Sequence, residues 1–172
     1  MPKTIVIYRT KYGSTRQYAQ WIAEELSCDA VPLADFDMGR LSTYDSVIFG
    51  TYYRVGKMVD IRFLIDNWKA LGSKKVILFS VSGSPPDNPE IKEKYEAQVP
   101  AEIRARLSYF PLRGRIKNLD IIDTVLMVFP KAKAFFDALR SGKKEDYATL
   151  RTMSNFDGVD RASIAQIIAE AK

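Results

Sequence analysis

Residues 4–26, TIVIYRTKYGSTRQYAQWIAEEL, decide the fold of this chain. Thr4–Tyr8 is a short run of mostly β-branched apolar residues, which predicts a buried strand. The polar stretch RTKYGST follows it, and in RQYAQWIAEEL the apolar residues recur at helical spacing. This part of the chain therefore predicts a strand, a loop and a helix, in that order.

The same pattern continues along the chain. A second unit begins in DAVPLADF, and further strands are expected at Asp45–Gly50, at Val76–Val81 and in YFPLRG. Helical patterns occupy IRFLIDNWKAL, EIKEKYEAQVPAEIRARL and DRASIAQIIAEAK. Strands that read as unbroken apolar runs and alternate with helices predict a parallel sheet that is covered on both faces.

The predicted architecture is a single α/β domain over residues 1–172. Its five parallel strands fit the doubly wound order 2-1-3-4-5, with helices on both faces and a helical insert, about residues 114–150, near the fifth strand. In such a sheet, ligands bind beyond the carboxyl ends of the strands, at the switch point between strands one and three. Three loops that leave strand ends of this kind are the candidate sites.

Composition narrows the chemistry. The chain has 172 residues, no histidine and one cysteine, Cys28. These residues exclude an intrachain disulfide, the usual zinc and copper sites and a Ser/His or Cys/His catalytic pair, so we expect no metal. The beginning, MPKTIVIYRT, lacks the pattern of a secretory signal, which predicts a cytoplasmic location. If the protein is an enzyme, a cofactor is expected to carry the chemistry.

The net charge of +5 is concentrated in one segment. Residues 113–144 contain eight basic and three acidic residues, which leaves the rest of the chain close to balanced. Within this segment, IIDTVLMVFPKAKAFFDAL has apolar residues spaced for one helical face. Peripheral contact with an anionic membrane, at the inner face, is one interpretation. The other is that the apolar face packs on the sheet and the basic side chains are solvated.

The first candidate loop is rich in hydroxyl groups and leads directly into a helix. It consists of Thr10, Lys11, Tyr12, Gly13, Ser14 and Thr15. Backbone N–H groups, hydroxyls and the positive end of the helix dipole attract an anion, and Gly13 permits close approach. The sequence is neither a Walker A loop nor G-x-G-x-x-G, so a mononucleotide phosphate is expected. The alternative is an ordinary helix cap, with Ser14 or Thr15 at the N-cap position.

The second candidate loop carries two adjacent tyrosines. It consists of Thr51, Tyr52, Tyr53, Arg54, Val55 and Gly56. One tyrosine is expected to stack on a flat cofactor ring such as an isoalloxazine, which adds about 0.5 to 1.5 kcal/mol beyond area burial. Alternatively, one tyrosine packs on the neighbouring helix and the other is half exposed.

The third candidate loop follows the strand at Val76–Val81. Ser82, Gly83 and Ser84 offer small polar side chains and backbone groups, which suit hydrogen bonds to the edge of a pyrimidine-like ring. Pro85–Asn88 is expected to form a rigid turn that leads to a helix capped near Asn88.

Together, YRTKYGST, YDSVIFGTYYRVGK and FSVSGSP resemble the flavodoxin-domain family, and the resemblance covers nearly the whole chain. It implies a flavodoxin-like fold and non-covalent FMN, with the phosphate on the first loop and the ring between the second and third loops. Within the family, YFPLRGRI and the basic insert resemble the branch of menaquinone-dependent protoporphyrinogen dehydrogenase. The chain departs from ordinary flavodoxins because it lacks their acidity and because Tyr12 replaces a small hydroxyl residue.

Two classes of function follow from this resemblance. The first is an electron carrier that passes electrons through FMN between redox partner proteins. The second is an FMN-dependent oxidoreductase that takes electrons from a small organic substrate and gives them to a quinone. In that case Arg113, Arg115 and Lys117 are candidates to pair with substrate carboxylates, and the alternative is a solvated charged surface. A flavin-free interaction domain is the third reading, and no nucleic acid partner is expected.

Overall fold

The computed structural model describes residues 2–116 and 156–172. The chain divides into two compact units, one formed by Met1–Gly114 with Val159–Lys172 and the other by Arg115–Gly158. In the second unit the described residues form a short antiparallel pair, β7 (Arg115–Ile116) with β8 (Phe156–Asp157). The rest of the predicted insert lies outside the described residues.

The first unit is built on a parallel sheet in the order β2-β1-β3-β5-β6. Its strands are β1 (Thr4–Tyr8), β2 (Asp29–Pro32), β3 (Ser46–Arg54), β5 (Lys75–Ser82) and β6 (Leu107–Arg113). This confirms the predicted order of five parallel strands. The short strand β4 (Lys57–Met58) adds an antiparallel partner to the end of β3.

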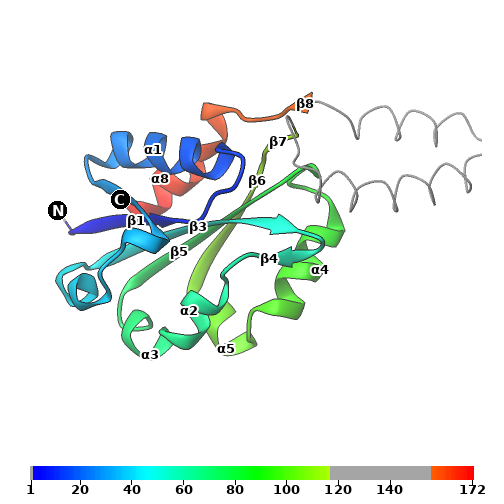
Figure 1. Cartoon of the computed structure of the whole chain (residues 1–172). Helices are drawn as coiled ribbons and strands as arrows, with labels where there is room; N and C mark the ends of the chain where they lie inside the picture. The colour runs from blue at the N-terminus through cyan, green and yellow to red at the C-terminus, as the bar shows by residue number, and fades with distance from the viewer. Residues whose placement is uncertain (1, 117–155) are drawn as a thin grey trace, which may run out of the picture. The chain divides into compact units, whose positions relative to one another are not determined.

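Helices cover both faces of this sheet (Figure 1). On one face lie α1 (Ser14–Leu26), the 3-10 turn η3 (Arg161–Ile164) and α8 (Ala165–Ala171). On the other face lie η1 (Leu33–Asp35), η2 (Met38–Thr43), α2 (Arg62–Asp66), α3 (Trp68–Leu71), α4 (Pro89–Gln98) and α5 (Ala101–Arg104). The unit is therefore a doubly wound, three-layer α/β fold, as predicted.

Alternation along the strands divides the core into two clusters. In β1, Val6 and Tyr8 pack with α1 and α8, whereas Ile5 and Ile7 pack on the opposite face. Because both faces are buried, the strand reads as an apolar run rather than an alternating pattern. Burying each such side chain stabilises the fold by about 1.5 to 3 kcal/mol.

Two of the predicted helices are each divided into shorter ones. The expected helix at 90–107 is interrupted between α4 and α5, because Pro100 lacks an N–H group and disfavours helical backbone at Val99. The expected helix at 61–71 is divided at Asn67. The third strand, expected to end at Gly50, continues to Arg54. Within the described ranges no helix is long and apolar enough to cross a membrane.

Candidate functional site

The switch point of the sheet lies where β1 ends beside β3. Tyr8, the last residue of β1, is in register with Gly50, and β3 continues beyond that point to Arg54. The chain leaves β1 through Arg9, whose N–H donates to the Gly50 carbonyl at 2.8 Å. The strand order reverses here, because β1 is followed on one side by β2 and on the other by β3. This is the place where doubly wound folds bind ligands.

The first loop ends in a helix start that is capped by backbone conformation alone. Gly13 is the N-cap residue, at φ 88°, and no side chain in the described part of the chain caps the helix. The Gly13 N–H instead donates to Thr10 Oγ1 at 3.1 Å, which closes the loop. The alternative in which Ser14 or Thr15 is the N-cap is therefore wrong, since both are helical residues.

The start of α1 also buries two hydroxyl groups. Ser14 is 6% exposed and Thr15 is 2% exposed. The first turn contains no acidic residue that would compete for its N–H groups. Backbone N–H groups, buried hydroxyls and the positive end of a 13-residue helix converge here, which is the chemistry of an anion site.

The end of β6 lies beside the first loop. The Gly114 N–H donates to the Ser82 carbonyl at 2.7 Å, and a β-carbon at Gly114 would lie 2.7 Å from Val81 Cγ1. The same β-carbon would lie 3.6 Å from Ser14 Oγ, an ordinary contact, so it is packing against Val81 that favours glycine here, beside the first loop. The sequence analysis assigned no role to Gly114.

Tyr18 connects α1 to the end of β6. Its side chain is fully buried, and its hydroxyl donates to the Arg113 carbonyl at 2.7 Å and accepts from the Asp160 N–H at 3.1 Å. Tyr18 thus fixes α1, one turn beyond Ser14, to both β6 and the closing segment. Helical periodicity identifies Tyr18 only as a core residue, so the sequence analysis missed this role.

The second loop is a strand end and a tight hairpin rather than an open loop. Val55 and Gly56 form the turn between β3 and β4, with φ angles of 50° and 74°. Thr51 is fully buried, and its hydroxyl donates to the Val59 carbonyl. The side chain of Thr51 therefore holds the hairpin, and only its backbone is available to a ligand.

The two tyrosines of this loop lie on opposite faces of the sheet. Tyr53 packs with α4, where its hydroxyl donates to the Ile91 carbonyl at 3.4 Å. Tyr52 is half-buried on the face that carries α1. The alternative of packing on a neighbouring helix thus describes Tyr53, and Tyr52 is the remaining candidate for contact with the cofactor ring.

Tyr53 belongs to a buried tyrosine cluster. Tyr95 and Tyr109 stack at 3.9 Å with an interplanar angle of 8°, and Tyr109 shares a hydrogen bond of 2.7 Å with Ser80. Burial raises the pKa of Tyr95 to about 12, and burial followed by the hydrogen bond with Tyr109 raises the pKa of Tyr53 above its ordinary value. Burial also raises the pKa of Tyr109. The three tyrosines are therefore neutral at physiological pH, and Tyr53 joins this cluster to the β3–β4 hairpin.

Some polar groups of the third loop form hydrogen bonds within the loop. Ser82 Oγ donates to the Ser84 carbonyl at 3.2 Å, Gly83 is exposed and Ser84 is half-buried. The Asn88 side chain accepts from the Glu90 N–H at 3.0 Å, which confirms the predicted cap of α4. The backbone groups of this loop are the part that a cofactor ring would meet.

A family model described as a flavodoxin domain matches residues 5–134. The chain belongs to the flavodoxin-domain family. The cofactor of this family is FMN, and its members are redox proteins, so this chain is an FMN-binding redox protein. Residues 5–134 include all three loops at the switch point. The match does not distinguish the protoporphyrinogen dehydrogenase branch from others.

One solved flavodoxin-like structure matches the fold with a TM-score above 0.5. The chain is 19% identical to the flavodoxin, WrbA-like protein from Agrobacterium tumefaciens, over 72% of this chain and 88% of that one, with a TM-score of 0.52. The chain is also 19% identical to the Trp repressor binding protein from Bacillus subtilis, over 65% of this chain and 85% of that one, with a TM-score of 0.47. For flavodoxin 1 from Bacillus cereus these values are 18%, 73%, 92% and 0.43. A search of curated proteins finds no match.

The residues at the switch point of this flavodoxin-domain protein fit FMN. The Gly13-capped helix start suits a phosphate dianion, which has several oxygens to accept from N–H and O–H donors. A bulkier pyrophosphate would call for the glycine-rich turn that the sequence lacks. Residues 2–116 and 156–172 contain no cluster of three or more side chains able to hold a metal ion.

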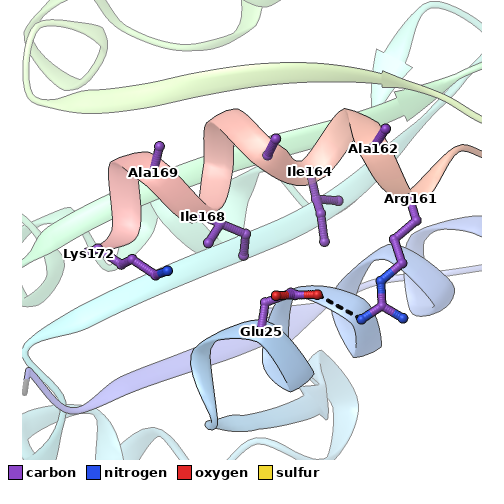
Figure 2. Close-up of a pocket in the computed structure, with 8 residues that line it drawn as sticks. Glu25, Arg161, Ala162, Ile164, Ile168, Ala169 and Lys172 are labelled. Carbon is purple, nitrogen blue, oxygen red and sulfur yellow. Dashed lines mark hydrogen bonds and ion pairs between the residues drawn. The ribbon is translucent and has the colours of Figure 1, made fainter.

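A hollow lies between α1 and α8, as Figure 2 shows. Its volume is about 510 Å³, and it is wide open to solvent. Ile164 and Ile168 line it, and Arg161 at its rim pairs with Glu25 at 2.9 Å and with Glu24 at 3.1 Å. Glu24 and Glu25 lie in the last turn of α1, at the opposite end from the first loop, and we assign this groove no ligand.

Proposed function

We propose that this protein holds FMN at the switch point through its three loops and carries electrons between redox partner proteins. The observation that carries the proposal is the start of α1. There a glycine caps the helix without a side chain, Ser14 and Thr15 are buried, and Ser14 Oγ lies near Gly114 at the end of β6. A phosphate can accept hydrogen bonds from the N–H groups of such a helix start.

Each loop has a distinct task in this proposal. Thr10 closes the first loop, and Ser14 and Thr15 donate hydrogen bonds to the phosphate together with the helix N–H groups. Lys11 lies over the Tyr12 ring, with Nζ 5.2 Å from its centroid.

The ring would lie between the second and third loops. Tyr52 flanks the ring, the backbone of Gly56 can approach it because glycine has no side chain, and Ser82–Ser84 contact its polar edge. FMN supplies reversible uptake and release of electrons when it is bound. The protein residues bind it, orient it and exclude water from it.

The second candidate function is a quinone-dependent oxidoreductase of the protoporphyrinogen dehydrogenase type. The observation that favours it is Arg113, which ends β6 at the same edge of the sheet as the three loops. A guanidinium at this edge suits a carboxylate-bearing substrate. Lys117 and most of the basic segment 113–144 lie outside the described residues.

Steady-state assays separate the two functions. FMN-loaded protein is assayed in two systems. The first is an electron-transfer chain of a reductase, this protein and a protein acceptor, and the second contains protoporphyrinogen and a menaquinone analogue. The proposal predicts rapid turnover only in the protein chain. Rapid substrate-dependent turnover with protoporphyrinogen would establish the enzyme instead.

The membrane prediction is tested separately. Co-sedimentation with anionic liposomes is measured at low and raised salt, with and without replacement of Lys131, Lys133, Lys143 and Lys144 by glutamine. Binding that is lost with salt and with the substitutions would support peripheral contact. Absence of sedimentation under all conditions would leave the apolar segment as a packed surface.

A further inference from the structure

The β3–β4 hairpin has little support of its own at its tip, Val55 and Gly56. The ladder between β3 and β4 has two residue pairs, and an isolated two-stranded hairpin is marginally stable at best. Val55 is 70% exposed and has φ 50°, a left-handed conformation that β-branched residues rarely adopt. Contacts from outside the hairpin are therefore needed to set the position of the tip.

Gln98, the last residue of α4, supplies such contacts, and α4 lies beside β4 (Figure 1). Its Nε2 donates to the Gly56 carbonyl at 3.1 Å, and its Oε1 accepts from the Met58 N–H at 2.8 Å. Nε2 also donates to the Lys94 carbonyl of its own helix at 2.9 Å. Reversing the amide would set its N–H groups against the Met58 N–H, so the hydrogen bonds themselves decide its orientation.

The end of α4 that carries this amide is itself fixed to the sheet. Val99, the next residue, is 1% exposed, and its N–H donates to the Tyr95 carbonyl at 3.0 Å. The buried Tyr95 ring stacks on Tyr109 of β6 at 3.9 Å. The Gln98 side chain is half-buried between this helix end and the hairpin. Its amide therefore joins the tip to a helix that packs on the core.

These hydrogen bonds also decide the direction of one backbone group at the tip. The Gly56 carbonyl accepts from a side chain of α4, so it is directed toward that helix. Tyr95 of α4 packs on one face of the sheet, whereas Tyr52, the candidate contact of the cofactor ring, packs on the other. The Gly56 carbonyl is thus engaged on the side away from Tyr52.

We propose that Gln98 is a positioning residue for the cofactor. By holding the Gly56 carbonyl and the Met58 N–H on the α4 side, it fixes which part of the tip the flavin ring meets. It acts through the hairpin and not by touching the ring. The inference rests on the proposed function, which places Gly56 beside the ring, and adds to it a residue 42 positions further along the chain.

Titration of the apo-protein with FMN and with riboflavin, followed by flavin fluorescence, tests the inference. Gln98→Met keeps the length of the side chain and removes the amide. It should weaken the binding of both ligands by the same factor, about fivefold, because both contain the ring. Gln166→Met is the control, an exposed glutamine of α8, and should leave both affinities within about twofold of the unmodified protein.

Gln98→Glu provides a test that general damage to the fold does not mimic. Its carboxylate can accept from the Met58 N–H but cannot donate to the Gly56 carbonyl, whereas the protonated acid can do both. Riboflavin is the ligand here, because the FMN phosphate itself titrates near about pH 6. At pH 7.5, taken as about the working pH, affinity should be about fivefold below that of the unmodified protein. It should recover as the pH falls through the ordinary glutamate pKa of about 4.3.

The unmodified protein, measured at each pH, is the reference, since its amide does not titrate. Gln166→Glu should follow that reference throughout. Gln98→Met that binds both flavins like Gln166→Met would overturn the inference, as would a loss of affinity for FMN alone. A deficit in Gln98→Glu that does not change with pH would also overturn it. Failure of the unmodified protein to bind FMN would refute the proposed function instead.

Discussion

The first loop and the tip of the β3–β4 hairpin, Val55 and Gly56, share an unusual backbone conformation. Gly13 and Val55 both have positive φ angles, 88° and 50°. At Gly13 the conformation is taken by a residue that suffers little strain, and it turns the start of a helix toward buried hydroxyls. At Val55 it is taken by a β-branched residue, at a cost of about 1 to 3 kcal/mol, and it turns apolar groups toward solvent. The first arrangement suits an anionic ligand, and the second leaves a valine side chain 70% exposed.

The largest expected effect separates the two tyrosines that lead to the tip. Tyr53→Ala removes a ring that packs under α4 and should destabilise the protein by about 3 kcal/mol. Tyr52→Ala should cost about 1 kcal/mol or less, since its ring is half-buried, but should change the fluorescence of bound FMN. Urea unfolding of the apo-proteins and flavin fluorescence measure the two effects. If both variants only destabilise the fold, the second loop is not the ring site.

Gly13→Ala tests the conformation at the first loop. A β-carbon there meets nothing within 4 Å, so the substitution adds strain without a clash. It should destabilise the apo-protein by about 1 kcal/mol and weaken FMN binding about tenfold, because the helix start is displaced. The matched change at the tip, Val55→Gly, should stabilise the protein by a similar amount. Equal destabilisation by both changes would remove the contrast between the two regions.

Thr15→Val tests the buried hydroxyl alone. Valine keeps the β-branched shape, so the free energy of unfolding of the apo-protein should change by less than about 1 kcal/mol. FMN affinity should fall about tenfold through the loss of one hydrogen bond to a charged group. Titration of apo-protein followed by flavin fluorescence gives the affinity. A loss of stability with unchanged affinity would assign the hydroxyl to the fold instead.

The smallest effect is expected in the tyrosine cluster, and only at high pH. Because burial raises the pKa of Tyr95 from 10 to about 12, this tyrosine contributes stability that is complete below pH 10 and is lost as pH rises to about 12. Tyr95→Phe cannot ionise, so its stability should fall less than that of the unmodified protein between pH 9 and 11. Parallel pH dependences of urea unfolding in the two proteins would contradict this.

The sequence predicts the sheet well because every central strand is buried on both faces. Continuous apolar runs such as Ile5–Ile7 and Val76–Val81 have no alternative interpretation once helical segments separate them. The helices are less predictable, since a break such as the one before Pro100 depends on one residue. The end of the third strand was predicted too early because Tyr52 and Tyr53 are equally typical of a binding loop and of a strand.

The sequence predicts the three loops of the candidate site, but not the residues that lie beside them. Thr10–Thr15 is recognisable because hydroxyls, a glycine and a helix start follow one another directly. Gly114 is distant from that loop in sequence, and so is Arg113, the hydrogen-bond partner of Tyr18, so the roles of Gly114 and Tyr18 depend on the end of β6 lying close to α1. The faces taken by Tyr52 and Tyr53 are likewise decided by the register of β3, which the loop sequence alone does not give.

The central claim is that the start of α1 holds a phosphate, and comparison of FMN with riboflavin tests it most directly. The two ligands share the ring and differ in the phosphate, so apo-protein titrated with each isolates the contribution of the first loop. We predict that FMN binds at least about a hundredfold more tightly, as several charge-assisted hydrogen bonds require. Equal affinity for FMN and riboflavin would contradict the account.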